Sequence, residues 1–98
     1  MLEKDIEARL VRGVKAMGGR AYKFVSPGNV GVPDRLVVLP GGRIVFVELK
    51  TERGVLSAPQ RQQIRVLRDL GADVRVLQGV AAVDRFLAVT KTGGGDAE

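Results

Sequence analysis

The apolar run of residues 44–47, Ile-Val-Phe-Val, leads directly into Glu48, Leu49 and Lys50. A run without alternation that is rich in β-branched residues is typical of a strand covered on both faces. Side chains two apart on a strand share a face, so Glu48 and Lys50 should point to one side of the sheet and Leu49 to the other. An acid and a base on one face at the end of a buried strand indicate a functional site rather than a device for stability.

A second carboxylate, Asp34, precedes the neighbouring apolar run of residues 36–39, which a Pro-Gly-Gly turn at residues 40–42 joins to the first run. A two-residue turn would place Asp34 opposite Leu49, whereas a three-residue turn places it opposite Glu48. We predict the three-residue register, or a bulge with the same result. Opposed residues share a face, with Cβ atoms about 4.5–5.5 Å apart.

Two carboxylates that close repel each other unless a cation lies between them. The chain has no His and no Cys, so its hard oxygen ligands suit Mg²⁺ or Mn²⁺. Such an ion can activate water and hold a phosphoryl oxygen, and the carbonyl of Leu49 could add a neutral ligand. Lys50 could orient or deprotonate that water, or stabilise the growing charge on the phosphate. The pattern favours metal-assisted phosphodiester hydrolysis; the alternative is a Glu48–Lys50 ion pair at a strand end, with Asp34 as an ordinary turn acid.

Composition sets the class of protein. The 98 residues suffice for one domain, and 45% of them are hydrophobic and 28% charged, as in ordinary soluble proteins. The absence of Cys, of a signal-peptide pattern and of a long apolar run makes the cytoplasm the expected location and gives no reason to expect a membrane. The formal charge of +5 favours a polyanionic partner such as nucleic acid, although simple solubility explains it equally well.

The rest of the chain predicts the elements that position these side chains. The patterns indicate a helix over residues 2–17, strands over 20–25, 36–39 and 44–50, a helix over 57–70, a strand over 73–77 and a short helix over 80–89, followed by a disordered tail over 90–98. A strand, a helix and a strand at this spacing predict a right-handed parallel crossover. The fold class is therefore α/β, with a single domain over residues 1–89.

Both longer helices carry residues that can be explained either by structure or by function. In the first, an apolar stripe is formed by Leu2, Ile6, Leu10, Val14 and Met17, and the acidic Glu3 and Asp5 of the first turn suit the helix dipole. Glu7 lies beside this stripe, where a solvated boundary residue is as good an explanation as a functional one. In the second, Ser57 should be the N-cap and Gln60 should complete a capping box, while Ile64, Leu67 and Leu70 form the buried stripe. Arg61, Arg65 and Arg68 form a further stripe, which is either solvated or a ridge that contacts phosphates.

Taken together, these segments resemble the PD-(D/E)xK nuclease superfamily, whose core is a helix, a three-strand meander, a helix and a strand. They resemble most closely the virus-type replication-repair nuclease (VRR-NUC) domains, in particular the small stand-alone versions associated with phages. The matching positions span residues 3 to 78. They are Glu7, Lys23-Phe24-Val25-Ser26-Pro27-Gly28, Gly31-Val32-Pro33-Asp34-Arg35, Pro40-Gly41-Gly42, Val47-Glu48-Leu49-Lys50 and Ser57-x-x-Gln60.

The resemblance implies a role for each matching position. Asp34, Glu48 and the Leu49 carbonyl would bind Mg²⁺ or Mn²⁺, and Lys50 would be the catalytic lysine. Glu7 would add a further carboxylate, and Gln60 would help to position the site. The basic and polar side chains near this site would contact DNA, and they are Lys23, Ser26, Arg35, Arg61 and Arg65.

Stand-alone members of the family resemble Holliday-junction resolvases, which implies a homodimer that cuts branched DNA. The leading expectation is thus a metal-dependent, structure-selective DNA endonuclease in the cytoplasm of a bacterium or a phage-infected host. The alternatives are a nuclease for flaps, ends or ordinary duplex, and a catalytically idle DNA-binding or dimerisation module. A sequence-reading transcription factor is disfavoured, because the sequence has no helix-turn-helix or ribbon-helix signature.

Overall fold

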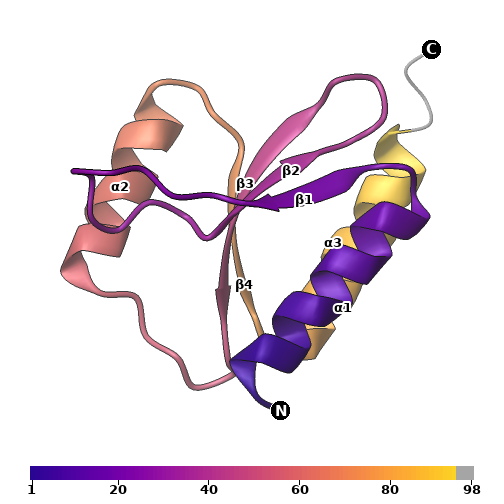
Figure 1. The fold of residues 1–98 in the computed structure, drawn as a ribbon, viewed down its shortest axis with the longest axis horizontal. Coiled ribbons are helices and arrows are strands. Elements are labelled where there is room, and N and C mark those ends of the chain that lie inside the picture. Colours follow the sequence, from indigo (N-terminus) through magenta and orange to yellow (C-terminus); the bar gives the residue numbers. More distant parts are fainter. Residues whose placement is uncertain (95–98) are drawn as a thin grey trace.

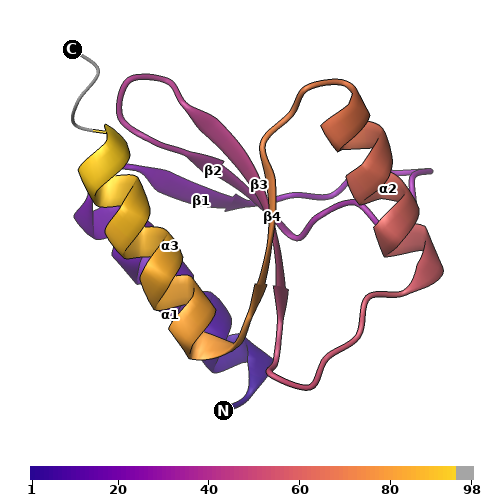
Figure 2. The same ribbon diagram turned by 180° about the vertical axis from the view of Figure 1, so that it is seen from behind.

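The computed structural model describes residues 1–94, with side chains through Lys91. The elements are α1 (Glu3–Ala16), β1 (Arg20–Lys23), β2 (Arg35–Val38), β3 (Ile44–Lys50), α2 (Ala58–Asp69), β4 (Val74–Gln78) and α3 (Gly79–Gly94). A mixed four-stranded sheet in the order β1-β2-β3-β4 separates two helical layers. Helices α1 and α3 lie side by side on one face, and α2 lies alone on the other (Figures 1 and 2). This is the predicted α/β core with a third helix appended.

The β2–β3 hairpin has the predicted register. Leu39 N donates to the Arg43 carbonyl over 2.8 Å, which closes a three-residue turn. The ladder then runs down to Arg35 opposite Val47. Because antiparallel partners advance in opposite directions, this register sets Asp34, the residue just before β2, beside Glu48. The turn length alone thus decides which residue faces Asp34.

The crossover from β3 to β4 is parallel, as predicted. The register aligns Glu48 with Val76 and Lys50 with Gln78. Strand β3 therefore has neighbours on both sides, and its core-facing residues Val45, Val47 and Leu49 are at most 1% exposed. A central strand of this kind gives the residues at its carboxyl end a rigid base.

The core lies between the sheet and the α1–α3 layer. Helix α1 contributes Ile6, Leu10 and Val14, the predicted stripe, and α3 contributes Val83 and Phe86. The two helices approach closely at Gly13, where an added Cβ would come within 2.4 Å of Leu87 Cδ1. Leu2, predicted to extend the stripe, is instead 62% exposed, because it precedes the helix as its N-cap residue.

Helix α2 begins as predicted but is buried less than predicted. Ser57 Oγ accepts from Gln60 N, and Gln60 Oε1 accepts from Ser57 N, which completes the capping box. The predicted stripe is wrong at its end, since Ile64 is buried but Leu70 is 80% exposed. The reason is that α2 contacts mainly the outer strand β4 and diverges from the rest of the sheet (Figure 1).

Helix α3 is longer than predicted. It does not end at Val89 but continues through Gly94, and Thr90 is buried at 5% exposure. Packing against α1 carries the helix past the point where its sequence, with Gly93 and Gly94, favours a break. The tail prediction is therefore wrong for residues 90–94, and residues 95–98 lie outside the described residues. No helix within residues 1–94 has the length and apolar character needed to cross a membrane.

Candidate active site

Asp34 and Glu48 meet at the end of the β2–β3 ladder. Asp34 Oδ2 accepts a hydrogen bond from Leu49 N over 3.1 Å, so this carboxylate lies against the backbone of β3. The carbonyl of Asp34 accepts from Phe24 N over 2.8 Å, which continues the β1–β2 pairing past the strand ends. Both strand neighbours therefore fix Asp34 beside Glu48.

The loop that precedes Asp34 packs closely against the start of α2. Gly31 has φ +95°, and a Cβ at this position would come within 2.5 Å of the Pro59 carbonyl and 2.8 Å of Gln60 N. Only glycine permits both this backbone conformation and this approach. Two residues later, Pro33 is fully buried. The position of Asp34 is thus tied to the first turn of α2 as well as to the sheet.

Glu48 is a buried carboxyl group with a perturbed pKa. Glu48 is only 1% exposed. Burial, together with the negative charge of Asp34, raises the pKa of Glu48 to about 7, although the nearby ammonium of Lys50 partly opposes both effects. Without a cation between the two carboxylates, ionisation of Glu48 beside the negative charge of Asp34 is unfavourable.

Gln60 links Glu48 to helix α2. Its side-chain oxygen caps the helix through Ser57 N, and its Nε2 donates to Glu48 Oε2 over 3.1 Å. One amide therefore both caps α2 and hydrogen-bonds Glu48. The second oxygen, Glu48 Oε1, is buried and has no hydrogen-bond partner among the described residues.

The residues present fit a divalent metal ion. A buried carboxylate oxygen without a partner is costly unless a cation or donor reaches it. Glu48 Oε1, the Asp34 carboxylate and the Leu49 carbonyl are all hard oxygen ligands of the type that Mg²⁺ and Mn²⁺ prefer. No group of three or more Asp or Glu side chains suited to a metal occurs in residues 1–94, so two carboxylates would have to be completed by the carbonyl and water.

Lys50 lies where the strand geometry predicted it. It is partly buried on the Glu48 side of β3, whereas Leu49 faces the core. Its positive charge lowers the pKa of Glu48, which places the ammonium within electrostatic reach of that carboxylate. Acid, acid and lysine therefore share one end of the sheet.

Glu7, predicted to add a further carboxylate, is part of an ion pair. Glu7 Oε2 forms an ion pair with Arg35 Nη2 over 3.0 Å, on the core-facing side of β2. The α1 carboxylate whose charge acts on Glu48 is that of Glu3. The start of α1 lies beside the end of β3 in both views (Figures 1 and 2). From the sequence, Glu3 was explained only as a first-turn acid that suits the helix dipole, and one further turn of helix separates it from Glu7.

The predicted DNA contacts divide into two groups. Arg35 has contacts within the fold. It pairs with Glu7 and donates to the Ala21 carbonyl over 3.0 Å, and its side chain is only 13% exposed. Lys23 is exposed, and Ser26 Oγ accepts from Asn29 Nδ2 within the loop that leads to Asp34.

Arg61 and Arg65 line a shallow groove between α2 and β4, together with Arg68. Arg61 donates to the Leu56 carbonyl over 2.7 Å and Arg68 to the Val74 carbonyl over 2.8 Å, so two of the three guanidinium groups are held in place. Arg65 is exposed. The groove lies on the same side of the sheet as the two carboxylates.

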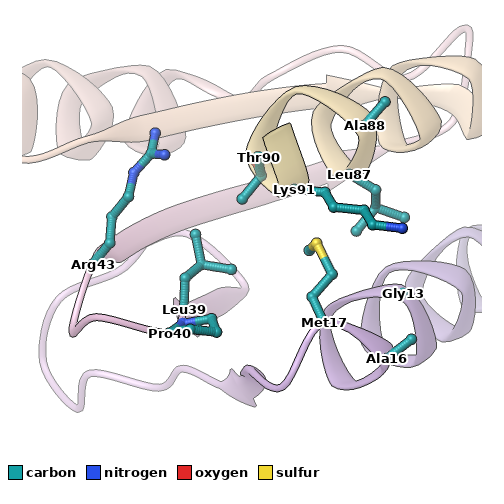
Figure 3. Close-up of a pocket in the computed structure, with 10 residues that line it drawn as sticks. All are labelled: Gly13, Ala16, Met17, Leu39, Pro40, Arg43, Leu87, Ala88, Thr90 and Lys91. Atoms are coloured by element: carbon teal, nitrogen blue, oxygen red, sulfur yellow. The ribbon is translucent and has the colours of Figure 1, made fainter. Parts of the chain in front are cut away.

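An apolar groove of about 540 Å³ lies elsewhere, between the ends of α1 and α3 and the β2–β3 turn (Figure 3). Met17, Leu39, Pro40 and Leu87 form much of its surface, and it has no carboxylate. It is therefore unsuited to hold a metal ion, and it belongs to the opposite face of the sheet.

The sequence and fold agree with known nuclease domains. The VRR-NUC domain model matches residues 6–81. The chain belongs to the VRR-NUC family. It is 51% identical over 75 residues to a protein of Acyrthosiphon pisum secondary endosymbiont phage 1 named "Putative nuclease p44", covering 76% of this chain and 81% of that protein.

Solved structures support the same assignment. A VRR-NUC domain with 32% identity superposes with a TM-score of 0.83, covering 88% of this chain and 94% of that chain. A second VRR-NUC domain protein shares the fold, with a TM-score of 0.67 at 15% identity over 93% of this chain and 90% of its own. The chain is thus a VRR-NUC nuclease domain, as its sequence motifs indicated.

Proposed function

We propose that this VRR-NUC domain is a metal-dependent DNA endonuclease whose centre is formed by Asp34, Glu48, the Leu49 carbonyl and Lys50. The observation that carries this proposal is the buried Oε1 of Glu48, which has no hydrogen-bond partner within the described part of the chain and lies beside a second carboxylate, that of Asp34. A structural ion pair would not require that arrangement. A cation would stabilise it, because it removes both the repulsion and the unsatisfied oxygen.

Each residue of the proposed centre would have a separate role. Asp34 and Glu48 would hold Mg²⁺ or Mn²⁺, which when bound supplies Lewis-acid activation of water and neutralises phosphate charge. Gln60 holds Glu48 Oε2 through its amide, so that Oε1 stays free for the ion. The Lys50 ammonium, on the same face, would orient the attacking water or donate to a phosphate oxygen as negative charge grows there.

Electrostatics also support DNA as the substrate. The net charge is +5, and Arg65 with Arg61 offers cations on the carboxylate side of the sheet. Lys23 and Ser26 would contact the backbone from the loop side. Arg35 would be less available to DNA, because it is largely buried and paired with Glu7.

We further propose a preference for branched DNA such as four-way junctions, cut by a homodimer in the cytoplasm of a bacterium or phage-infected host. A domain of 98 residues offers little surface to grip a duplex, and a two-fold dimer would present two sites to a pseudo-symmetric junction. The junction preference and the homodimer rest on the family resemblance, and the phage setting rests on the similarity to the phage protein p44.

Cleavage of a labelled four-way junction beside a linear duplex tests the proposal, with Mg²⁺, Mn²⁺ or EDTA. The variants are native protein, Asp34→Asn and, as a control, Asp5→Asn, which changes an exposed acid of α1. We expect paired junction cuts that need metal, survive in Asp5→Asn and vanish in Asp34→Asn. Equal cutting of both substrates would retain the nuclease and overturn the junction preference. Full activity of Asp34→Asn would overturn the site.

A further inference from the structure

Lys50 is the last residue of β3, and the chain turns back on itself immediately after it. Residues 51–54 form a β-turn closed by a hydrogen bond from Gly54 N to the Thr51 carbonyl over 3.0 Å. The turn brings Gly54 against the stem of Lys50. A Cβ added at Gly54 would lie 3.1 Å from Lys50 Cβ and 3.2 Å from Lys50 Cδ.

The far side of this turn is held by β4. Gln78, the register partner of Lys50, donates from Nε2 to the Gly54 carbonyl over 2.6 Å. Gln78 is exposed, so this hydrogen bond contributes little to the core. Its consequence is local, because it fixes the distance between Gly54 and the strand that carries Lys50.

The same turn also lies close to the start of α3. Gly79 is buried with φ +83°, and a Cβ there would come within 2.8 Å of the Glu52 carboxylate. Glu52 therefore lies at the start of α3, where the helix dipole favours a negative charge. The 51–54 turn is thus hydrogen-bonded to Gln78 and lies beside Gly79, at the end of β4.

We propose that Gln78 and Gly54 are positioning residues for Lys50. A long lysine side chain at a strand end has several accessible rotamers, and an unsupported Lys50 would spread over them. The Gly54 backbone blocks part of that space and Gln78 prevents the turn from moving away, so the Lys50 ammonium is directed along the Glu48 face. This inference rests on the proposed function, because it assigns the turn a role in the reaction of Lys50.

Two variants probe the arrangement. Gly54→Ala needs no left-handed backbone, and its new methyl group would press chiefly on the Lys50 stem. Gln78→Leu keeps the size of the side chain and removes the donor to the Gly54 carbonyl. The matched controls are Val55→Ala, an exposed residue next to the turn, and Gln62→Leu, an exposed glutamine of α2.

The readouts are kcat and KM for cleavage, the Mn²⁺ affinity by calorimetry and the midpoint of thermal unfolding. For Gly54→Ala and Gln78→Leu we expect kcat to fall about tenfold, since small displacements of a reacting group cost one to two orders of magnitude. KM, Mn²⁺ affinity and the unfolding midpoint should stay near the native values, as all four should in both controls.

A double-mutant comparison separates positioning from general damage. In a Lys50→Arg background that retains measurable activity, Gln78→Leu should lower kcat much less than it does in the native protein, because the residue that it positions has already been changed. Equal losses in both backgrounds, or native kcat in both Gly54→Ala and Gln78→Leu, would overturn the inference. Failure of the native protein to cleave with any divalent ion would instead overturn the proposed function.

Discussion

The amide of Gln60 bridges Glu48 and the N-terminus of α2. Its Nε2 donates to Glu48 Oε2 over 3.1 Å while its Oε1 accepts from Ser57 N over 2.9 Å. Helix α2, which has few other contacts with the sheet, is therefore attached to β3 through Glu48. This connection means that capping of α2 and the shape of the proposed metal centre depend on one side chain.

Ser57→Ala and Gln60→Ala should separate these two roles. Each variant removes part of the capping box and should lower the free energy of unfolding by about 1 kcal/mol. Only Gln60→Ala also removes the contact with Glu48, so only this variant should weaken Mn²⁺ binding. Urea unfolding and calorimetric titration measure the two effects. Equal Mn²⁺ affinity in both variants would contradict a site-forming role for Gln60.

Glu48 should make the metal-free protein less stable as the pH rises. Its folded pKa of about 7 lies above the ordinary value of 4.5, so the folded state binds more protons than the unfolded state between these values. The contribution of Glu48 to stability is fully present below pH 4.5 and is lost as the pH rises through 7. Asp73 and Asp84, whose pKa values are lowered by Arg75 and Arg9, titrate below this window.

Urea unfolding in EDTA between pH 4.5 and 8.5 measures this dependence. In native protein the free energy of unfolding should fall by an amount on the order of 1–3 kcal/mol, since one pKa unit corresponds to about 1.4 kcal/mol. Glu48→Gln should lose most of the slope and be more stable than native protein at pH 8. The same slope in both proteins would assign the proton uptake to another group.

Glu3 and Glu7 should behave differently despite lying one turn apart. Glu7→Gln breaks the ion pair with the largely buried Arg35 and should lower the free energy of unfolding by about 1 kcal/mol, with unchanged Mn²⁺ affinity. Glu3→Gln removes a charge that raises the pKa of Glu48, so the pH midpoint for Mn²⁺ binding should move down. Calorimetry over a pH series measures both. An unchanged midpoint in Glu3→Gln, or a shifted one in Glu7→Gln, would reverse the assignment.

Arg65 should contribute to DNA affinity without reading sequence. Arg65→Gln should weaken binding to junction and duplex alike and reduce the slope of log K against log salt by about 1. Arg9→Gln is the matched control, because Arg9 is paired with Asp84 on the opposite helical layer. Fluorescence anisotropy in Ca²⁺ or EDTA, without cleavage, measures both. Equal salt slopes in native protein and Arg65→Gln would place the DNA on another surface.

The sequence predicted how Asp34, Glu48 and Lys50 are arranged, because that geometry depends on local rules. The period of two along a strand places Glu48 and Lys50 on one face, and a three-residue turn sets Asp34 opposite Glu48. The spacing of Ser57 and Gln60 predicted the capping box in the same way. None of these predictions required knowledge of how distant elements pack.

The errors concern the placement of whole helices. A helical stripe cannot show which turn of α1 passes the strand ends, so the effect of the Glu3 charge on Glu48 was not foreseen, and the role of Glu7 stays a prediction. The exposed Leu70 follows from the angle at which α2 leaves the sheet, and the added length of α3 follows from its packing on α1. Tertiary contacts decide these features, and amino-acid patterns do not encode them position by position.

The most direct test of the site is a crystal of the native protein grown with Mn²⁺, examined by its anomalous signal. We expect one peak between Asp34 and Glu48, about 2 Å from Glu48 Oε1, an Asp34 carboxylate oxygen and the Leu49 carbonyl. The peak should be absent in crystals of Asp34→Asn grown in the same way. A native crystal in which Mn²⁺ binds elsewhere, with Glu48 hydrogen-bonded to Asp34 and no ion between them, would contradict the account.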